Sequence, residues 1–78
     1  MIDEPLSIPK PLREKVAMFP ESSMGANLVT LDLVDGRKIH GVCIAWASEI
    51  VKVAQREIKS EKDLDFRVQD IIGIHSEI

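Results

Sequence analysis

The clearest structural signal in the chain is the stretch VTLDLVDGRKIH, residues 29–40. Its first half alternates apolar residues, Val29, Leu31 and Leu33, with polar ones, which is the pattern of a strand with one buried face. An Asp-Gly pair at 35–36 then marks a turn, and a second run of alternating residues follows it. The stretch therefore predicts a β-hairpin.

The length of the turn decides which side chains share a face of this hairpin. A two-residue loop would mix apolar and polar side chains on both faces. A three-residue loop at 34–36 instead pairs Leu31 with Ile39 on one face and Asp32 with Lys38 on the other, where opposite charges attract. We therefore expect a three-residue turn that ends in a left-handed glycine and forms a bulge.

The second strand is expected to bend at Gly41, because the phase of the apolar residues changes there. Such a bend is what a small closed barrel requires. Later strands are predicted at 50–53, at 66–68 and at 74–78, with a single turn at 70–73 before the last one. The charged stretch 55–65 reads as a solvated hairpin tip.

The beginning of the chain divides into two parts. Residues 1–10, MIDEPLSIPK, hold two of the four prolines and predict an extended or disordered arm. A short helix is expected at 11–19, where Pro11 suits the first turn and Leu12, Val16 and Phe19 share a face. Residues 11–78 would then form a single domain.

Composition excludes several classes of protein. Ten basic and thirteen acidic residues give a net charge of −3, so no overall positive field attracts nucleic acid or acidic lipid. A single cysteine rules out an internal disulfide. The sequence contains no apolar run near the ~18 residues that a membrane span needs, so we expect no membrane partner.

The order of elements resembles that of SH3-like barrels, including their Sm-like branch. The Sm first motif is similar to residues 31–41, with L-x-L-x-D-G, four further residues and a glycine, followed by an aromatic at Trp46. Sm-like RNA binders carry an aspartate after that aromatic, where this chain has Ala47. They also carry a basic pair where this chain reads IGIH at 72–75. The resemblance therefore implies a five-stranded SH3-like barrel with a short N-terminal helix, and it weakens the RNA-binding function.

A closer resemblance covers residues 11–76. The segments FPESSMG at 19–25, LVDGR at 33–37 and FRVQDI at 66–71 are similar to a group of small uncharacterised bacterial proteins with a PESxMG…DGR…FxxxDI pattern. This chain departs from the pattern at Ser23, Ala26 and Asp65. The resemblance implies the barrel fold and a bacterial, cytoplasmic setting. A fainter similarity is to the small bacterial inhibitor of the Rho terminator, a barrel that acts by protein contact.

Two groups of residues are candidate contact sites. The first combines the loop between helix and barrel with the sole tryptophan, because loops on rigid scaffolds often carry function and aromatics are enriched at interfaces. Its residues are Glu21, Ser22, Ser23, Met24 and Trp46. In so small a core a tryptophan is more often a packing residue, so both roles of Trp46 stay open. The second group is a basic patch expected from Arg37, Lys38, Lys52 and Arg56.

No residue pattern indicates catalysis or a cofactor. His40 and Cys43 are spaced as H-x-x-C, but two ligands cannot complete a zinc site. Cys43 has apolar neighbours, which indicate an inert thiol. His75 with Asp70 could form an acid–base pair, although a surface histidine is the plainer interpretation. We expect no enzyme and no cofactor or metal.

The sequence therefore predicts a non-enzymatic protein-interaction module of the bacterial cytoplasm, with a protein partner whose identity is unknown. Self-association through an open strand edge is a second expectation. The alternative is an Sm-like RNA-binding oligomer, although nucleic acid is the less favoured partner.

Overall fold

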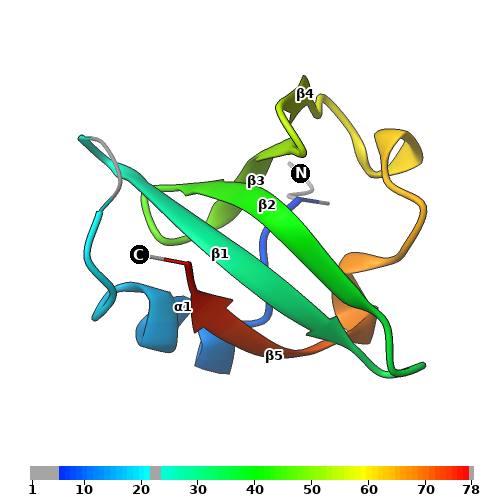
Figure 1. Ribbon diagram of the computed structural model, residues 1–78, viewed down its shortest axis with the longest axis horizontal. Coiled ribbons are helices and arrows are strands. Elements are labelled where there is room, and N and C mark those ends of the chain that lie inside the picture. The colour runs from blue at the N-terminus through cyan, green and yellow to red at the C-terminus, as the bar shows by residue number, and fades with distance from the viewer. Residues whose placement is uncertain (1–5, 22–23, 78) are drawn as a thin grey trace, which may run out of the picture.

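The computed structural model describes residues 6–21 and 24–77, which form a mainly β fold with one short helix (Figure 1). All five strands belong to one antiparallel sheet, in the order β4-β3-β2-β1-β5. Two short 3-10 turns, Glu61–Asp63 and Val68–Asp70, lie between β4 and β5. The elements in chain order are α1 (Lys10–Val16), β1 (Ala26–Leu33), β2 (Lys38–Ala45), β3 (Glu49–Val53), β4 (Arg56–Glu57) and β5 (Ile71–Ser76).

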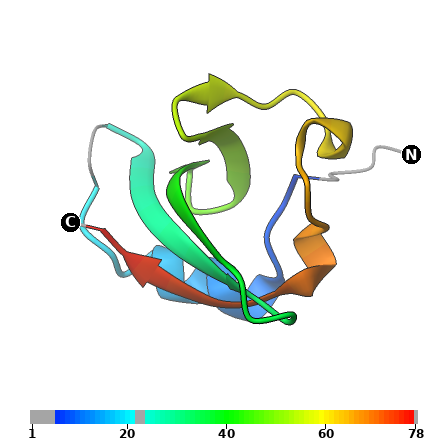
Figure 2. The ribbon, with the colours of Figure 1, turned by 45° about the vertical axis from the view of Figure 1, so that its right-hand side comes forward.

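The sheet curves around the core but does not close into a barrel (Figure 2). Its two edges are β4 and β5, which do not pair with each other in the described part of the chain. β4 has only two residues, and the segment that follows it forms turns instead of a strand. The prediction of a five-stranded barrel is therefore confirmed for the strand number and the helix, and closure is not observed.

The predicted hairpin of β1 and β2 is confirmed in its register. Leu31 pairs with Ile39 and Asp32 pairs with Lys38. Gly36 has φ +94°, and its N–H donates to the Leu33 carbonyl at 2.9 Å. The loop is therefore the bulged three-residue turn expected from the face-sharing argument.

Gly41 forms the predicted bulge in β2. The register runs from Val29–Val42 to Leu31–Ile39, so that two residues of β2 lie opposite Thr30 alone. Gly41 has φ +67°, which a residue with a side chain rarely adopts. The bulge bends β2 and lets it pair with β1 on one side and β3 on the other.

The core is a single cluster of aliphatic side chains and one phenylalanine enclosed by the curved sheet, and α1 contributes Val16 to it. The N-terminal segment also contributes, because Ile8 is 1% exposed. The Ile8 N–H donates to the Ser48 carbonyl at 2.9 Å, and the Ile50 N–H donates to the Leu6 carbonyl at 3.0 Å. The folded domain therefore includes residues 6–10, which the sequence pattern placed in the arm; residues 1–5 lie outside the described residues.

The second half of the chain departs most from the prediction. The expected strand at 66–68 is absent, because Phe66 lies in a bend and Val68 begins a 3-10 turn. β5 begins at Ile71, three residues earlier than expected, so the predicted turn at 70–73 is wrong. Ile58 is 5% exposed, so the stretch 55–65 is not wholly a solvated tip. Phe66 and Val68 are still buried, but turns instead of a strand direct them into the core.

Within the described residues, no helix has the length and apolar character needed to cross a membrane. The one α-helix, α1, ends at Val16, three residues earlier than predicted, and continues as a turn up to Pro20.

We predict that Gly36→Ala lowers the free energy of unfolding by about 1 kcal/mol, because alanine is strained at φ +94°. A Cβ there would meet no atom within 4 Å, so the loss would come from the backbone alone. Urea unfolding measures it, with Gly36→Asn as the control, since asparagine tolerates the left-handed region. Equal losses in both variants would contradict the role of backbone strain.

Candidate functional site

Trp46 and Ala47 are the two central residues of the turn between β2 and β3. Their φ angles are 55° and 60°, and the Ser48 N–H donates to the Ala45 carbonyl at 3.0 Å. This is the geometry of a type I′ turn, in which asparagine and glycine are the favoured residues. A side chain in the left-handed region costs on the order of 1–3 kcal/mol. The turn is therefore an unfavourable place for a tryptophan, unless the tryptophan serves another purpose.

Gly25 supports the Trp46 turn from the start of β1. The register brings the two together, because Ala26 pairs with Ala45. The Trp46 N–H donates to the Gly25 carbonyl at 2.7 Å, and the indole lies against the glycine, where an added Cβ would be 2.9 Å from the ring. Gly25 also has φ +73°, so its lack of a side chain serves both the backbone and the ring.

Trp46 remains 79% exposed despite this contact, so the interpretation of Trp46 as a core residue is wrong. Only one face of the ring rests on Gly25, and the rest meets solvent. Tertiary structure decides this outcome, because a two-residue turn at the end of the sheet points away from the enclosed core.

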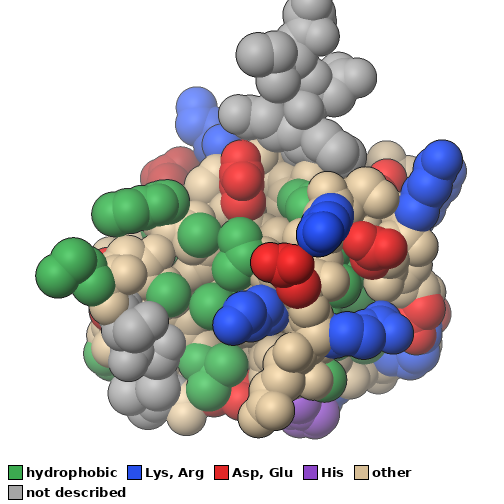
Figure 3. Space-filling view, turned by 90° about the horizontal axis from the view of Figure 1, so that it is seen from above, with side chains coloured by type: hydrophobic (Ala, Val, Ile, Leu, Met, Phe, Trp, Pro, Cys, Tyr) green, Lys and Arg blue, Asp and Glu red, His purple; other side chains and the backbone are tan. Residues whose placement is uncertain are grey.

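Two exposed methionines and a shallow hollow accompany the tryptophan. Met24, which is 94% exposed, is the chain neighbour of Gly25, and Met18, which is 86% exposed, follows α1. In Figure 3, hydrophobic side chains gather toward one end of the molecule and charged side chains of both signs toward the other. We define the Trp46 face by its residues: Met18, Met24 and the residues that line the hollow, namely Lys10, Arg13, Glu14, Ala17, Trp46, Ala47 and Ser48.

The loop predicted as a contact site borders the Trp46 face. Glu21 and Met24 are exposed, whereas Ser22 and Ser23 lie outside the described residues. A buried side chain fixes the start of this loop: Asn27 is 3% exposed, and its Nδ2 donates to the carbonyls of Phe19 and Pro20, at 3.4 Å and 3.2 Å. The sequence analysis did not identify Asn27. Asn27 could have been found from its position, because it is a polar residue in phase with the buried side chains of β1.

The residues of the predicted basic patch are spread along two strands. Lys38 lies at the start of β2, whereas Lys52 of β3 pairs with Cys43, five residues further along β2. Lys38 donates to Asp32 at 2.8 Å, so its charge is neutralised locally. Arg37 and Arg56 are also held by their surroundings. Arg37 contacts the carboxylates of Asp35 and Asp65, and Arg56 donates to the Asp63 carbonyl.

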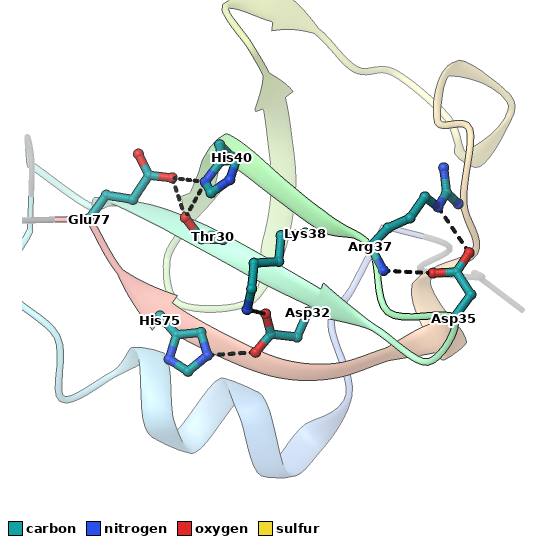
Figure 4. A network of polar contacts seen from close by, with 8 residues as sticks. All are labelled: Thr30, Asp32, Asp35, Arg37, Lys38, His40, His75 and Glu77. Carbon is teal, nitrogen blue, oxygen red and sulfur yellow. Dashed lines mark hydrogen bonds and ion pairs between the residues drawn. The ribbon is translucent and has the colours of Figure 1, made fainter.

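Two polar clusters lie side by side on the outer face of β1 (Figure 4). In the first, Asp32 accepts hydrogen bonds from Lys38 at 2.8 Å and from His75 Nε2 at 2.5 Å. Gly73 leaves room for this arrangement, because a Cβ there would meet the Asp32 carboxylate at 2.9 Å. The hydrogen bond from Lys38, and then that from His75, lowers the pKa of Asp32. The sequence had raised Asp70 as a partner for His75. In the structure, His75 instead pairs with Asp32.

The second cluster joins the end of β5 to the bulge in β2. The Glu77 carboxylate accepts a hydrogen bond from the Thr30 hydroxyl at 2.6 Å and another from the Gly41 N–H at 2.8 Å. His40 Nδ1 lies 3.1 Å from the same hydroxyl and donates to it when it carries a proton. The hydrogen bonds from Thr30 and then Gly41 lower the pKa of Glu77. Glu77 therefore fastens three strands together on one face of the sheet.

The two clusters join strands to one another, and this geometry supports stability. Thr30 is 9% exposed, and its hydroxyl already donates to a carboxylate, so it is a poor nucleophile. Cys43 is a half-buried free thiol. Over residues 6–21 and 24–77, no group of three or more histidine, cysteine, aspartate or glutamate side chains could hold a metal ion.

Comparison with protein-family models, with curated proteins and with solved structures yields no match to this chain. The resemblances to Sm-like barrels and to the small bacterial group thus stay predictions from motifs. Function has to be argued from the geometry of the chain itself, and the Trp46 face is the surface that folding leaves least explained.

We predict that Glu77→Gln flattens the dependence of stability on pH in acid. The pKa of Glu77 is lowered in the folded state from the ordinary value of 4.5. The folded state therefore resists protonation, and the contribution of Glu77 is complete above that value and lost as pH falls through the lowered pKa. Urea unfolding midpoints between about pH 6 and pH 3 measure the change.

The matched control for Glu77 is Glu57→Gln, which removes an exposed carboxylate whose one described side-chain contact is Lys59 at 4.0 Å. This variant should keep the pH profile of the unaltered chain. If the profile of Glu77→Gln ran parallel to that of the unaltered chain, Glu77 would not fasten β5 to the bulge.

Proposed function

We propose that this chain is a non-enzymatic protein-interaction module that binds a partner through the Trp46 face. The observation that carries the proposal is an exposed tryptophan in a left-handed turn, 79% exposed with φ 55°. Folding alone would favour asparagine or glycine at this position. Interface centres, by contrast, are enriched in tryptophan.

The surroundings of Trp46 support the same proposal. Met18 and Met24 are long, unbranched and polarizable, and such side chains adapt to the shape of a partner. The described chain exposes five large apolar side chains, and three of them belong to the Trp46 face; the other two, Val34 and Ile72, lie elsewhere. An exposed apolar group of this kind is typical of a contact site.

We further propose that the curved sheet, although its two edges do not pair, has the SH3-like architecture of the Sm-like type, and that the protein acts in the bacterial cytoplasm. Support comes from the element order, from the bulge in β2 and from the 3-10 turn immediately before β5. Self-association through β5 is part of the proposal, because β5 has a strand partner, β1, on one side only among the described strands.

The alternative proposal is an Sm-like RNA-binding oligomer, and it has less support. Arg37 and Lys38 are bound by carboxylates, so they offer little free charge to a phosphate backbone. Light scattering at low and high salt separates the two. A particle of several chains would favour the oligomer, and one or two chains would favour the module.

Site-specific photocrosslinking in the cells from which the gene comes tests the module. A photoreactive residue at Met24 should yield a discrete crosslinked protein, whereas one at Val34, which is 64% exposed but outside the Trp46 face, should not. Identical products from both positions, or none from Met24, would overturn the proposal. A product that ribonuclease degrades would favour the RNA-binding alternative.

We predict that Trp46→Asn leaves the free energy of unfolding unchanged or raises it by up to about 1 kcal/mol, because asparagine suits the left-handed turn. Chemical denaturation measures this. As a control on β2, the strand that precedes the turn, Ile44→Ala should lose about 2–5 kcal/mol, since Ile44 is fully buried. A loss above about 2 kcal/mol for Trp46→Asn would assign the ring to folding and not to binding.

A further inference from the structure

The helix that borders the Trp46 face is positively charged in an acidic protein. α1 carries Lys10, Arg13 and Lys15 but only one carboxylate, Glu14, a net charge of +2, whereas the whole chain carries −3. Elsewhere in the described chain, Arg37, Lys38 and Lys59 lie within 4.0 Å of a carboxylate, and four further cations do not. The three cations of α1 have no described carboxylate within the 4.0 Å of an ion pair. Within the described residues, no ion pair neutralises the positive charge of α1, which can therefore attract an acidic ligand.

Arg13 is the most unusual of these cations. Its side chain is half-buried, and its Nε is fully buried without a hydrogen-bond partner in the described structure. Folded proteins leave few buried donors unsatisfied, so such an atom calls for an explanation. Arg13 lines the hollow beside Trp46, so its guanidinium group can meet a ligand there, although the Nε atom itself has no exposed surface. The planar guanidinium is well suited to a carboxylate, which it can bind through two parallel hydrogen bonds.

We propose that the Trp46 face binds an acidic peptide segment of a partner protein. Arg13 and Lys10 hold a carboxylate of that segment in the hollow, and an adjacent apolar side chain rests on Trp46. This inference rests on the proposed interaction function and specifies the chemistry of its partner. Charge complementarity supplies attraction and orientation, and the aromatic ring supplies apolar contact area.

The observations favour a peptide over a nucleic acid. Glu14 lines the same hollow and would repel a continuous run of phosphates more than a single carboxylate. Met18 and Met24 suit the aliphatic and aromatic side chains of a peptide.

Intrinsic fluorescence tests the proposal without a label, because Trp46 is the sole tryptophan of the chain. The probe is a capped peptide of about eight residues in which glutamate alternates with leucine, and the matched peptide carries glutamine for glutamate. We expect a saturable change in emission with the acidic peptide and binding at least about tenfold weaker with the neutral one. No saturable change, or equal affinity for both peptides, would overturn the proposal.

Variants assign the binding to Arg13. Arg13→Gln should weaken binding of the acidic peptide by about tenfold or more and leave the weak binding of the neutral peptide unchanged. Lys52→Gln makes the same charge change at an exposed residue of β3 outside the Trp46 face, and it should alter affinity by less than about twofold. Equal losses of affinity in the two variants would mean that only the net charge of the protein matters, and would refute a specific carboxylate site.

Two further measurements keep the outcome unambiguous. Far-UV circular dichroism shows whether Arg13→Gln folds. If it does not, Lys10→Gln replaces it, since Lys10 is exposed. Lys10→Gln should weaken binding of the acidic peptide about threefold, and an unchanged affinity would refute the site. An oligouridylate of about ten nucleotides that displaces the acidic peptide at equal or lower concentration would assign the face to nucleic acid. If neither peptide binds while crosslinking from Met24 persists, the proposal of an interaction module is kept and the proposal of an acidic partner is refuted.

Discussion

The bulge at Gly41 is the constraint on which the sheet depends. Its backbone takes part in three connections: the extra residue in the pairing of β2 with β1, an N–H that donates to Glu77 at 2.8 Å, and a carbonyl that accepts from Ala54 at 3.0 Å. The first bends β2, the second holds the chain beyond β5, and the third holds the turn between β3 and β4. A side chain at φ +67° would be strained, and its Cβ would lie 3.6 Å from the Ala54 backbone. One glycine thus positions both halves of the sheet.

The curvature that follows from this bulge explains how the Trp46 face arises. Because β2 is bent, its end at Ala45 pairs with the start of β1, and this pairing brings Gly25 beside Trp46. The glycine accepts the Trp46 N–H and leaves space for the indole. The surrounding strands therefore hold a turn conformation that tryptophan would not adopt alone. What they hold in place is an exposed aromatic ring, which adds little to the core.

Charge is distributed unevenly over the two sides of the molecule. On the outer face of β1, the ionised side chains form local hydrogen bonds: Asp32 binds Lys38 and His75, and Glu77 binds Thr30. Such contacts join strands and leave little free charge. Beside Trp46 the opposite holds, because the cations of α1 have no described carboxylate near them and Arg13 keeps a buried donor without an acceptor. Local contacts account for the charges on the first side, and the second is the side on which we propose that a partner binds.

The sequence by itself determined the features that depend on neighbouring residues. The register of the β1–β2 hairpin, the left-handed Gly36 and the bulge at Gly41 follow from alternation and turn chemistry, and all three are observed. These signals are short-range, because the period of a strand and the φ of a turn are set within a few residues. The mainly β class and the single short helix can also be predicted from these local patterns.

Tertiary structure alone decided where the remaining residues lie. Ile8 enters the core because its segment pairs with the start of β3, a partner distant in the chain that no local pattern reveals. Phe66 and Val68 alternate as in a strand, yet turns bury them equally well. The role of Trp46 stays open between core and surface until its turn is seen to project from the end of the sheet, and His75 meets Asp32 only because β5 pairs with β1. These placements depend on segments that meet only on folding, so they cannot be derived from the order of residues.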